Sequence, residues 1–310
     1  MSFEYNPTIA KRFMSLYWLR PENGLLTYFK SQCFSHLPPK SPSLDISCGD
    51  GLFMLLHLGG ELDDKTDYFN ATKANEFNHN NQIDIFDTSD PNYFPKVITA
   101  PQYQINHGTD WKDNLLAKSA KLNLYENLHL HDNNSVPFPF KENYFEWIYS
   151  NSIYWTPNIS SVLKDIKRML TETGKVILGI ATPYFVNTLN ELENHLEPRA
   201  MKILDRDRRN SYKGMNTFEE WNELIENSGL SIDSVSSVYP NRYIMDIWNI
   251  GLRPFNHLLV KMADQIDEKT YLQIKQEWVE ICIDLSSSIA NLGPHFEIDQ
   301  APYLLYVLKK

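Results

Sequence analysis

The chain has 310 residues, enough for one large hydrophobic core, and its apolar fraction of 42% is that of an ordinary folded protein. Its net charge of −10 (29 Lys and Arg against 39 Asp and Glu) argues against binding nucleic acid, because phosphates require clustered Lys and Arg. Three distant cysteines suit a reducing compartment, and no apolar run approaches the ~20 residues of a membrane span. We therefore expect a cytoplasmic protein without a membrane span.

Residues 1–40 are predicted to form a helical N-terminal cover. Ile9, Phe13 and Met14 recur at roughly helical spacing, and a second apolar run extends from 25 to 34. Such a pattern buries one face of each helix against a core.

The stretch 41–56 is the most informative part of the chain. A short apolar strand carries Asp45 and then breaks into a tight turn at Gly49 and Gly51, which a helix-like run follows at once. Glycine lets the backbone approach a ligand closely, and the unpaired amides of a first helical turn point at that ligand. The corner is therefore typical of anion and nucleotide binding.

The corner lacks the features that hold phosphates. A dinucleotide site has a third glycine, but Leu52, Phe53 and Met54 follow Gly51, and no Lys-Ser/Thr pair completes a phosphate loop. A ligand with an amino-acid tail, a ribose and an adenine but no phosphate fits better. Cys48 is expected to be a small side chain packed beside that ligand, not a nucleophile.

A second strand is predicted from 103 to Asp110, followed by a helix with Asp113 as its N-cap. A carboxylate at such a strand end can accept both ribose hydroxyl protons. A rival strand with acids, 83–87, has no amphipathic helix behind it. The choice of Asp110 implies an insertion at about 59–103, which we expect to be a long loop on the side of the sheet away from the cofactor. Stability or self-association as a homo-oligomer is its predicted role.

The next short strand, 127–132, ends in another acid, Asp132, and Asn133 follows it. A carboxylate there could accept hydrogens from an adenine amine. The alternative for these two residues is an ordinary strand-end turn. His129 and His131 share a strand face with no third ligand at fixed spacing, so no metal site is predicted.

The passage 136–155 leads into a central strand at 145–149, with Ser150 and Asn151 at its carboxyl end. A helix with apolar residues from 159 to 170, a turn at Thr173-Gly174 and a buried strand at 175–180 follow. This alternation predicts a parallel sheet flanked by helices.

The C-terminal third continues less regularly. Thr217 and Glu220 form a capping box for a helix that Gly229 stops, and strands are predicted at 230–239 and 303–308. The segments 181–216 and 240–302 leave the same rim of the sheet and are expected to cap a substrate. Candidates to line this cap are Tyr184, Arg242, Tyr243, Trp248, His257 and His295. The run Arg206-Asp207-Arg208-Arg209 is expected to form solvated ion pairs on a helix.

Residues 42–182, without the insertion, resemble the class I S-adenosylmethionine-dependent methyltransferases, in particular the small-molecule branch with "methyltransferase domain 11". The resemblance is carried by residues 44–51, by the Gly-x-Asp at 108–110 and by residues 136–151. The chain departs from the family at Ser47, where the family usually has glycine. The resemblance implies an α/β fold with a Rossmann-like, mostly parallel sheet, an antiparallel last strand and a helical cap at 240–302. The cofactor core would span 41–239 and 303–310. The implied cofactor contacts are Asp45, Ser47, Cys48, Gly49, Gly51, Asp110, Trp111, Asp132, Asn133, Ser150 and Asn151.

The resemblance further implies methyl transfer from S-adenosyl-L-methionine, by in-line displacement, to a small-molecule, sugar or lipid-linked acceptor. No catalytic base is assigned. The segment 5–13 resembles the aromatic-led helix that the family lays over its cofactor, although it could cover only the core. A non-catalytic cofactor-binding or regulatory subunit is the first alternative, since Ser47 departs from the family. A nicotinamide-dependent oxidoreductase is the second, and the missing third glycine disfavours it.

Overall fold

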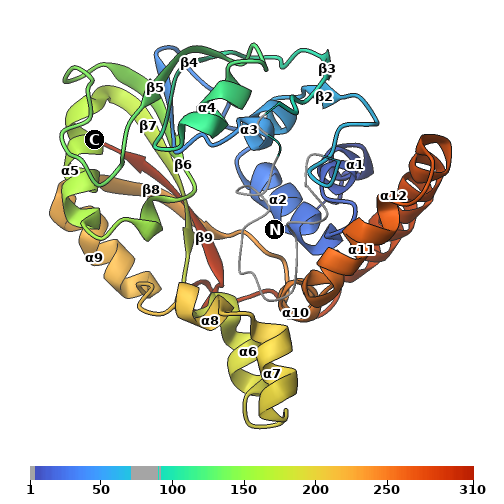
Figure 1. Ribbon diagram of the computed structural model, residues 1–310. Helices are drawn as coiled ribbons and strands as arrows, with labels where there is room; N and C mark the ends of the chain where they lie inside the picture. Colours follow the sequence, from blue (N-terminus) through green and yellow to red (C-terminus); the bar gives the residue numbers. More distant parts are fainter. Residues whose placement is uncertain (1–3, 71–89, 91) are drawn as a thin grey trace.

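The computed structural model describes residues 4–70, 90 and 92–310 (Figure 1). The rival acidic strand considered at 83–87 lies outside these residues. Within the part that is described, no helix combines the length and apolar character needed to cross a bilayer.

A seven-stranded sheet organises the chain, in the order β5-β4-β1-β6-β7-β9-β8. The pairs β1–β4, β1–β6, β4–β5 and β6–β7 are parallel, and β9 runs antiparallel to both of its neighbours. The predicted Rossmann-like sheet with an antiparallel last strand is therefore confirmed. Its strands are β1 (Ser43–Ile46), β4 (Ile105–Asp110), β5 (Tyr125–Leu130), β6 (Phe145–Ser150), β7 (Leu170–Ala181), β8 (Ser231–Ser237) and β9 (Tyr303–Lys309).

Helices cover both faces of this sheet (Figure 1). On one face α5 packs against α9, whose predicted capping box and left-handed Gly229 C-cap are both present. On the other face α2 packs against α1 and α3, and the 23-residue α12 lies along α1. These helices are α1 (Pro7–Leu16), α2 (Pro21–Cys33), α3 (Leu52–His57), α4 (Asp113–Ser119), α5 (Ile159–Met169), α9 (Phe218–Ser228) and α12 (Glu268–Ala290).

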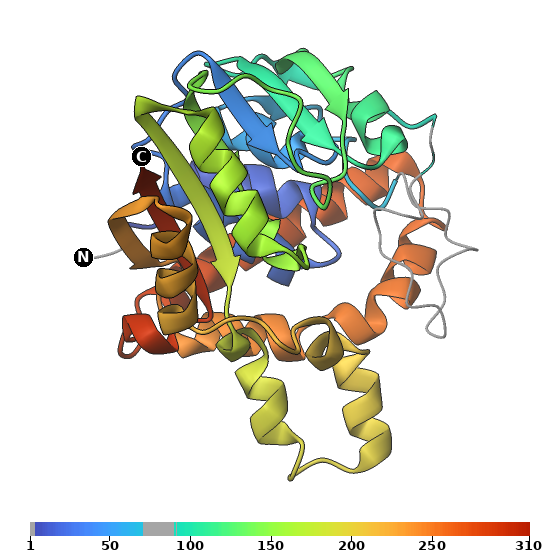
Figure 2. The same ribbon diagram turned by 90° about the vertical axis from the view of Figure 1, so that its left-hand side faces the viewer.

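The chain passes outward from β1 through β4 to β5 and then returns to β6 on the other side of β1. Ligands of such sheets bind beyond the carboxyl ends of the strands at this reversal. In Figure 2 the parallel strands point toward the helices that follow β7 and β8, so these helices lie below that edge. They are α6 (Asn187–Leu192), α7 (Pro198–Asp205), α8 (Arg208–Ser211), α10 (Arg242–Ile250) and α11 (Asn256–Ala263). The described residues also form the 3-10 turns η1 (Ile153–Trp155), η2 (Pro183–Val186), η3 (Arg253–Phe255) and η4 (Ile298–Gln300).

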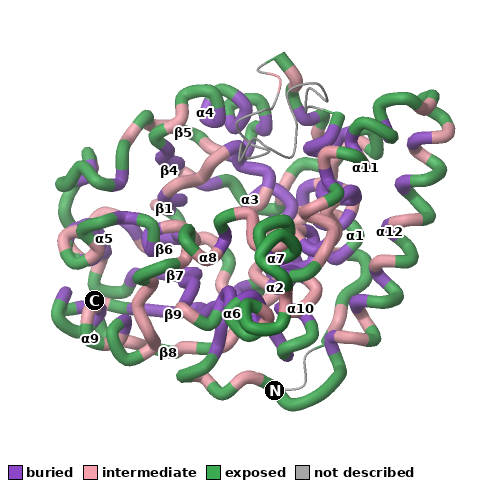
Figure 3. Tube along the Cα trace, turned by 60° about the horizontal axis from the view of Figure 1, so that its bottom comes forward, coloured by how far each residue is buried: buried purple, intermediate pink, exposed green. Residues whose placement is uncertain are grey.

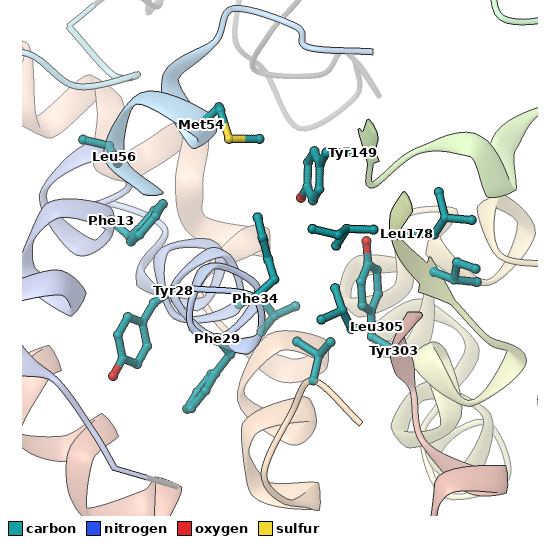
Figure 4. Close-up of a cluster of buried hydrophobic side chains, with 14 of the residues drawn as sticks. Phe13, Tyr28, Phe29, Phe34, Met54, Leu56, Tyr149, Leu178, Tyr303 and Leu305 are labelled. Atoms are coloured by element: carbon teal, nitrogen blue, oxygen red, sulfur yellow. The ribbon is translucent and has the colours of Figure 1, made fainter. Parts of the chain in front are cut away.

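The core lies between the sheet and α1–α3. Phe34 stacks on Tyr149 of β6 with ring centroids 4.8 Å apart, and Figure 4 shows it between α2 and the sheet. Burial follows the sheet and the helices packed on it, whereas α6 and α7 are mostly exposed (Figure 3). Only Met201 of α7 is buried.

Two local predictions are wrong. The expected turn at Thr173-Gly174 does not form, because β7 begins directly after α5 and is continuous to Ala181. Its pairing with β6 shifts register here, and a Cβ on Gly174 would lie 2.7 Å from the Phe145 carbonyl oxygen. Glycine therefore permits an irregular strand, not a reversal. The N-cap of α4 is Lys112, and Asp113 is its first helical residue.

The insertion is also placed differently from the expectation, as far as it is described. It contains a two-stranded antiparallel sheet, β2 (Glu61–Leu62) with β3 (Val97–Thr99). Between these two strands, Tyr68 reaches the glycine turn, where its hydroxyl donates to Asp50 at 2.9 Å. The prediction that this segment lies away from the cofactor side is therefore wrong for its described residues.

Candidate functional site

The glycine turn joins β1 to α3 in a left-handed conformation. Ser47, Gly49 and Gly51 have φ values of 60°, 58° and 77°. A Cβ on Gly51 would lie 2.9 Å from Leu122, so both conformation and packing require glycine there. Apart from its chain neighbours, no described atom lies within 4 Å of where a Cβ of Gly49 would be. The Cα of Gly49 is therefore on the open side of the turn, while the Gly49 carbonyl accepts from the Ser119 hydroxyl at 2.8 Å.

Asp110 is fixed against this turn. One of its carboxylate oxygens accepts the Gly49 amide at 3.0 Å, and the other accepts the Lys112 amide at 2.9 Å. The Cys48 amide donates to the Thr109 carbonyl at 2.8 Å, which holds the two strand ends together. The structure thus brings the second strand-end acid to the first strand's turn. Each carboxylate oxygen retains capacity for a further donor such as a hydroxyl.

Asp45 is buried within β1, before the glycine turn, with 3% of its surface exposed. Burial raises the pKa of its carboxyl to about 7; a hydrogen bond from the Tyr125 hydroxyl opposes the rise and the Asp110 carboxylate adds to it. That hydrogen bond is 2.6 Å long. In the β1–β4 pairing Asp45 faces Gly108, where a Cβ would lie 2.9 Å from the Tyr125 ring. Glycine at 108 therefore makes room for Tyr125.

Asp50 and Tyr68 belong to the site although the sequence reasoning chose neither. One oxygen of the Asp50 carboxylate accepts from the Tyr68 hydroxyl and the other from the Leu52 amide at 3.1 Å. Burial raises the pKa of Asp50, and these two hydrogen bonds act in the opposite direction. Asp50 could have been chosen from the sequence, because it stands between the two glycines of the motif. Tyr68 could not have been chosen, because it contacts the turn from a distant loop and no local pattern marks it.

Asn133, not Asp132, faces the glycine turn. The Asn133 side chain donates to the Ser47 hydroxyl. Asp132 is exposed, and its Oδ1 accepts from both the backbone amide and the side chain of Asn134. Its carboxylate therefore caps the strand-end turn that was the alternative interpretation. The adenine contact of Asp132 stays a prediction.

The remaining candidates lie around this centre. Ser150 is fully buried, and its hydroxyl donates to the Ile46 carbonyl at 3.1 Å, so it ties β6 to β1. Asn151 is partly buried and its carbonyl accepts from the Tyr303 hydroxyl at 3.2 Å. Trp111, next to Asp110, is 65% exposed, and the Lys112 ammonium lies over its ring at 5.4 Å from the centroid.

The charge at the turn favours a cation. Burial raises the pKa of the Cys48 thiol, and the carboxyls of Asp45, Asp110 and Asp50 add to the rise. The thiol therefore stays protonated, as its packing role requires. Three acids this close would repel a pyrophosphate but attract the ammonium and sulfonium of S-adenosylmethionine. Together with the open side of the turn at Gly49, these donors and charges fit that cofactor.

No metal-binding chemistry is assembled in the described part of the chain, which contains no group of three His, Cys, Asp or Glu that could hold an ion. His107 and His129 contact each other at 3.0 Å across β4 and β5. Burial lowers the pKa of both, so they form a neutral pair.

The helices below the carboxyl edge carry aromatic side chains. Phe185, just after β7, stacks on Tyr212 and meets Trp248 edge-on, each with centroids 4.6 Å apart. It also reaches Tyr303, whose ring lies 6.0 Å away. Of the predicted cap residues, Trp248 is buried, Tyr243 is 49% exposed, and His295 bonds the Pro240 carbonyl.

Several solved structures similar to this chain are described as S-adenosylmethionine-dependent methyltransferases. One from Thermotoga maritima, a possible histamine N-methyltransferase, is 12% identical with a TM-score of 0.47, over 98% of each chain. A putative sarcosine dimethylglycine methyltransferase from Galdieria sulphuraria is 11% identical, with a TM-score of 0.45 over 93% of this chain and 87% of that one. The 4+2 cyclase SpnF is 12% identical, with a TM-score of 0.47 over 91% and 81%.

No protein-family model matches the chain, and no curated protein matches it in sequence. At these identities and TM-scores the likeness supports no conclusion about the reaction or the fold. The fold class therefore rests on this chain's own strand order.

Proposed function

We propose that the protein transfers a methyl group from S-adenosyl-L-methionine to a small-molecule acceptor. The observation that carries the proposal is the hydrogen bond from the Gly49 amide to Asp110, at 3.0 Å. It joins the glycine turn after β1 to the acid that ends β4, and both lie where the strand order of the sheet reverses. A ligand with a cationic tail and a ribose, but no phosphate, would fit a site made of the glycine turn and the Asp110 carboxylate.

The chain's own residues would divide the binding between them. The Gly49 backbone and the buried Asp45 would hold the cationic amino-acid tail. Asp110 would accept from the ribose hydroxyls, and Asn133 and Trp111 would border the adenine. The cofactor supplies an activated methyl group, so the protein's task is to align an acceptor and exclude water.

A small acceptor is favoured by what lies below the carboxyl edge. Phe185, Tyr212 and Trp248 lie between β7 and β9 in the chain, and Tyr303 begins β9; their rings pack together. Such side chains recognise flat or partly apolar molecules, whereas nucleic acid would need clustered surface cations.

Calorimetric titration with S-adenosylmethionine and with its demethylated product tests the cofactor. We expect both to bind and NAD to show no heat. If NAD binds and the sulfonium compound does not, the chain is a dinucleotide protein and the proposal fails.

Transfer itself is tested with methyl-labelled cofactor and a panel of amine, hydroxyl, thiol and carboxyl acceptors. We expect labelled product with at least one class. Binding without turnover across the panel would instead support the non-catalytic alternative, which Ser47 motivates because it keeps the glycine-type conformation without being glycine.

A further inference from the structure

Lys30 of α2 lies against the aromatic side chains below the carboxyl edge of the sheet. Its ammonium nitrogen is 4.2 Å from the ring centroid of Tyr303, the first residue of β9, which is a cation–π contact. Among the described residues Lys30 makes no hydrogen bond and no ion pair. Its side chain is partly exposed. The amine of Lys30 is therefore available to a ligand that packs on the same ring.

Two more tyrosines pack on Tyr303. The ring centroid of Tyr239, just after β8, lies 5.8 Å from that of Tyr303, and the centroid of Tyr154, in η1, lies 6.1 Å from it. Tyr239 is 1% exposed, and its hydroxyl is buried with no hydrogen-bond partner among the described residues. A buried hydroxyl without a partner is unfavourable, so a ligand group that hydrogen-bonds to it would be stabilised there.

These residues adjoin the proposed cofactor site. The Tyr303 hydroxyl donates to the Asn151 carbonyl at 3.2 Å, directly after the end of β6. On β6 itself, Tyr149 is paired with Asp45 of β1. A molecule held against Tyr303 would therefore lie at the same edge of the sheet as the glycine turn, which is where a methyl acceptor is needed.

Lys30 differs from the titratable groups around it. Burial lowers the pKa of its ammonium to about 8. Burial also raises the pKa of Tyr154 to about 12 and holds the pKa values of Tyr239 and Tyr303 well above their usual range. On α2 the thiol of Cys33 has its pKa raised to about 12 by burial. The phenols and the thiol are therefore neutral over the range in which Lys30 gains and loses its proton.

The helices packed on α2 contribute other ionisable groups. Burial lowers the pKa of His57 of α3 to about 4 and raises that of Cys282 of α12 to about 11. Arg12 of α1 and Arg242 of α10 are cations that pair with carboxylates. On α2 itself, Glu22 lies about two turns from Lys30 and 3.9 Å from an arginine. A pH dependence near pH 8 would therefore be assigned to Lys30 by replacing it.

A permanent charge packs on the neighbouring rings. The Arg208 guanidinium lies 3.9 Å from the Trp248 ring centroid, and Arg208 is only 4% exposed. Trp248 meets Phe185, whose ring lies 6.0 Å from that of Tyr303. Arginine keeps its proton, so this charge does not titrate with Lys30. At Arg208 the run 206–209 is therefore not the solvated ion-pair surface that the sequence suggested.

We propose that Lys30 takes the proton from the hydroxyl group of a phenol-type methyl acceptor that binds against Tyr303 and Tyr239. The inference rests on the proposed function and names its acceptor class and its general base. A flat ring packs well on aromatic side chains, and its hydroxyl can hydrogen-bond to the Tyr239 hydroxyl and to the Lys30 amine. The positive charge of protonated Lys30 repels an ammonium acceptor and stabilises a phenolate.

The reaction step balances with the methyl donor of the proposed function. The neutral Lys30 amine accepts the hydroxyl proton and becomes an ammonium. The acceptor oxygen forms a bond to the methyl carbon while the carbon–sulfur bond breaks, and the electron pair of that bond stays on sulfur as a neutral thioether. The ammonium then releases its proton to solvent, which restores the base.

The first test measures binding by the full chain without cofactor, with 4-nitrophenol, whose anion is yellow and whose neutral form is not. We expect it to bind and its pKa, read from absorbance over a pH titration, to be lower when bound than in solution, because the Lys30 cation favours the phenolate. Lys30→Met should lose this lowering. Lys164→Met, the same change at an exposed lysine of α5, should behave like the parent. Failure to bind, or an equal pKa of the bound phenol in Lys30→Met and the parent, overturns the proposal.

The acceptor class is tested with a second variant and a second compound. Tyr239→Phe keeps the ring and removes the buried hydroxyl, so it should weaken 4-nitrophenol binding about fivefold, the effect of one hydrogen bond. Benzylamine, a cation of similar size, should bind more weakly than 4-nitrophenol. If benzylamine binds more tightly, the acceptor is an amine and the proposal is wrong. Unchanged affinity in Tyr239→Phe would contradict it equally, because the phenol would not meet this hydroxyl.

Methyl transfer to phenol, with labelled cofactor at saturation, tests the base itself. We expect kcat/KM to rise as the pH passes through about 8, because only the neutral amine can take a proton. Lys30→Met should lose this rise and lower kcat about 100-fold. Lys30→Arg keeps the cation and should still lower the pKa of bound 4-nitrophenol, yet it should fail to restore transfer, because arginine does not give up its proton.

The outcomes separate this inference from the proposed function. Transfer to phenol at the parent rate in Lys30→Met overturns the role of Lys30 and leaves methyl transfer intact. If no acceptor is methylated while bound 4-nitrophenol still depends on Lys30, the proposed function fails and the phenol site remains. Far-ultraviolet circular dichroism verifies that each variant is folded before its binding or rate is used.

Discussion

Asp45 gives the proposed cofactor site a pH dependence near neutrality. Its carboxyl is buried and its pKa is raised to about 7, so it is largely protonated just below that pH. A cationic ligand interacts favourably only with the ionised form. We therefore expect the affinity for S-adenosylmethionine, measured by calorimetry, to rise between about pH 6 and about pH 8 and then to level off. Binding at pH 7 should release protons, seen as a heat that varies with the buffer.

The variant Asp45→Asn tests the origin of this dependence. Its affinity should be lower and nearly independent of pH over the same range, since the amide does not titrate. The same raised pKa also affects folding: the neutral carboxyl stabilises the native state below about pH 4, and this contribution is lost as the pH rises through about 7. An unchanged pH profile in Asp45→Asn would assign the titration to another group.

Ser47 combines backbone strain with a polar contact. Its φ of 60° is the left-handed region, which costs a residue with a Cβ roughly 1 kcal/mol relative to glycine. Its hydroxyl accepts from Asn133, which offsets part of that cost. We expect Ser47→Ala to lower the free energy of unfolding by about 1 kcal/mol, because it loses the contact and keeps the strain. Ser47→Gly should be about 1 kcal/mol more stable than Ser47→Ala in urea titrations. Equal stability of the two variants would contradict a strained turn.

At the scale of single residues, the sequence predicted the acids better than their partners. Asp45 and Asp110 could be chosen because Asp45 lies one residue before the end of its strand and Asp110 ends its strand, each beside a turn or a helix, and that pattern is local. Tyr125 and Asp45 are 80 positions apart and Asn133 and Ser47 are 86 apart. Such contacts depend on strand order and register, which no local pattern contains. For the same reason Asp132 could not be separated from Asn133.

At the scale of elements, a buried ion pair ties α12 to the insertion. Lys275 Nζ lies 2.9 Å from Asp67, and the side chains are 5% and 0% exposed. Lys275 also donates to the carbonyls of Asp64 and Thr66, and Tyr271 donates to Asp67 at 2.8 Å. The next residue, Tyr68, reaches the glycine turn. The pair therefore holds the loop that carries Tyr68.

We predict that Lys275→Met lowers the free energy of unfolding by about 3 kcal/mol, because it leaves the Asp67 carboxylate buried without its cation. The matched control is Lys309→Met, which breaks an ion pair with Asp233 in which Lys309 is 53% exposed. That change should cost at most about 1 kcal/mol in the same urea titration. Equal effects of the two substitutions would show that burial does not distinguish these pairs.

Elements could be predicted where local signals agreed. The capping box of α9, its glycine stop and the alternation from β4 to β7 all act within a few residues of each element. The turn expected at Thr173-Gly174 failed because glycine there serves packing against Phe145, a residue on the neighbouring strand. A glycine needed for close approach and one needed for a turn look alike in a sequence.

At the scale of the whole molecule, one continuous core joins the two ends of the chain. The main cluster of buried side chains runs from Ala10 in α1 to Leu308 in β9 and includes residues of β1, β6 and α12. A second, smaller cluster of Val186, Leu189 and Met201 lies in the α6–α7 segment. We therefore expect the sheet and the helices around it to unfold together, so that a ligand held at the glycine turn stabilises them as a unit.

This cooperativity makes thermal unfolding a readout of the proposed site. At a concentration 100 times its dissociation constant, the demethylated cofactor should raise the free energy of unfolding by about 2.7 kcal/mol, equivalent to roughly 4 °C in melting temperature. Asp110→Asn should lose most of this shift, because one of the amides that now donates to the carboxylate would face an NH2 group, and the ribose would lose an ionised acceptor. Asp113→Asn, three positions away and exposed, should keep the full shift. If the ligand raises the melting temperature of Asp110→Asn as much as that of the parent, the ligand does not bind at the end of β4. If NAD produces a comparable rise in melting temperature, the glycine turn is a dinucleotide site.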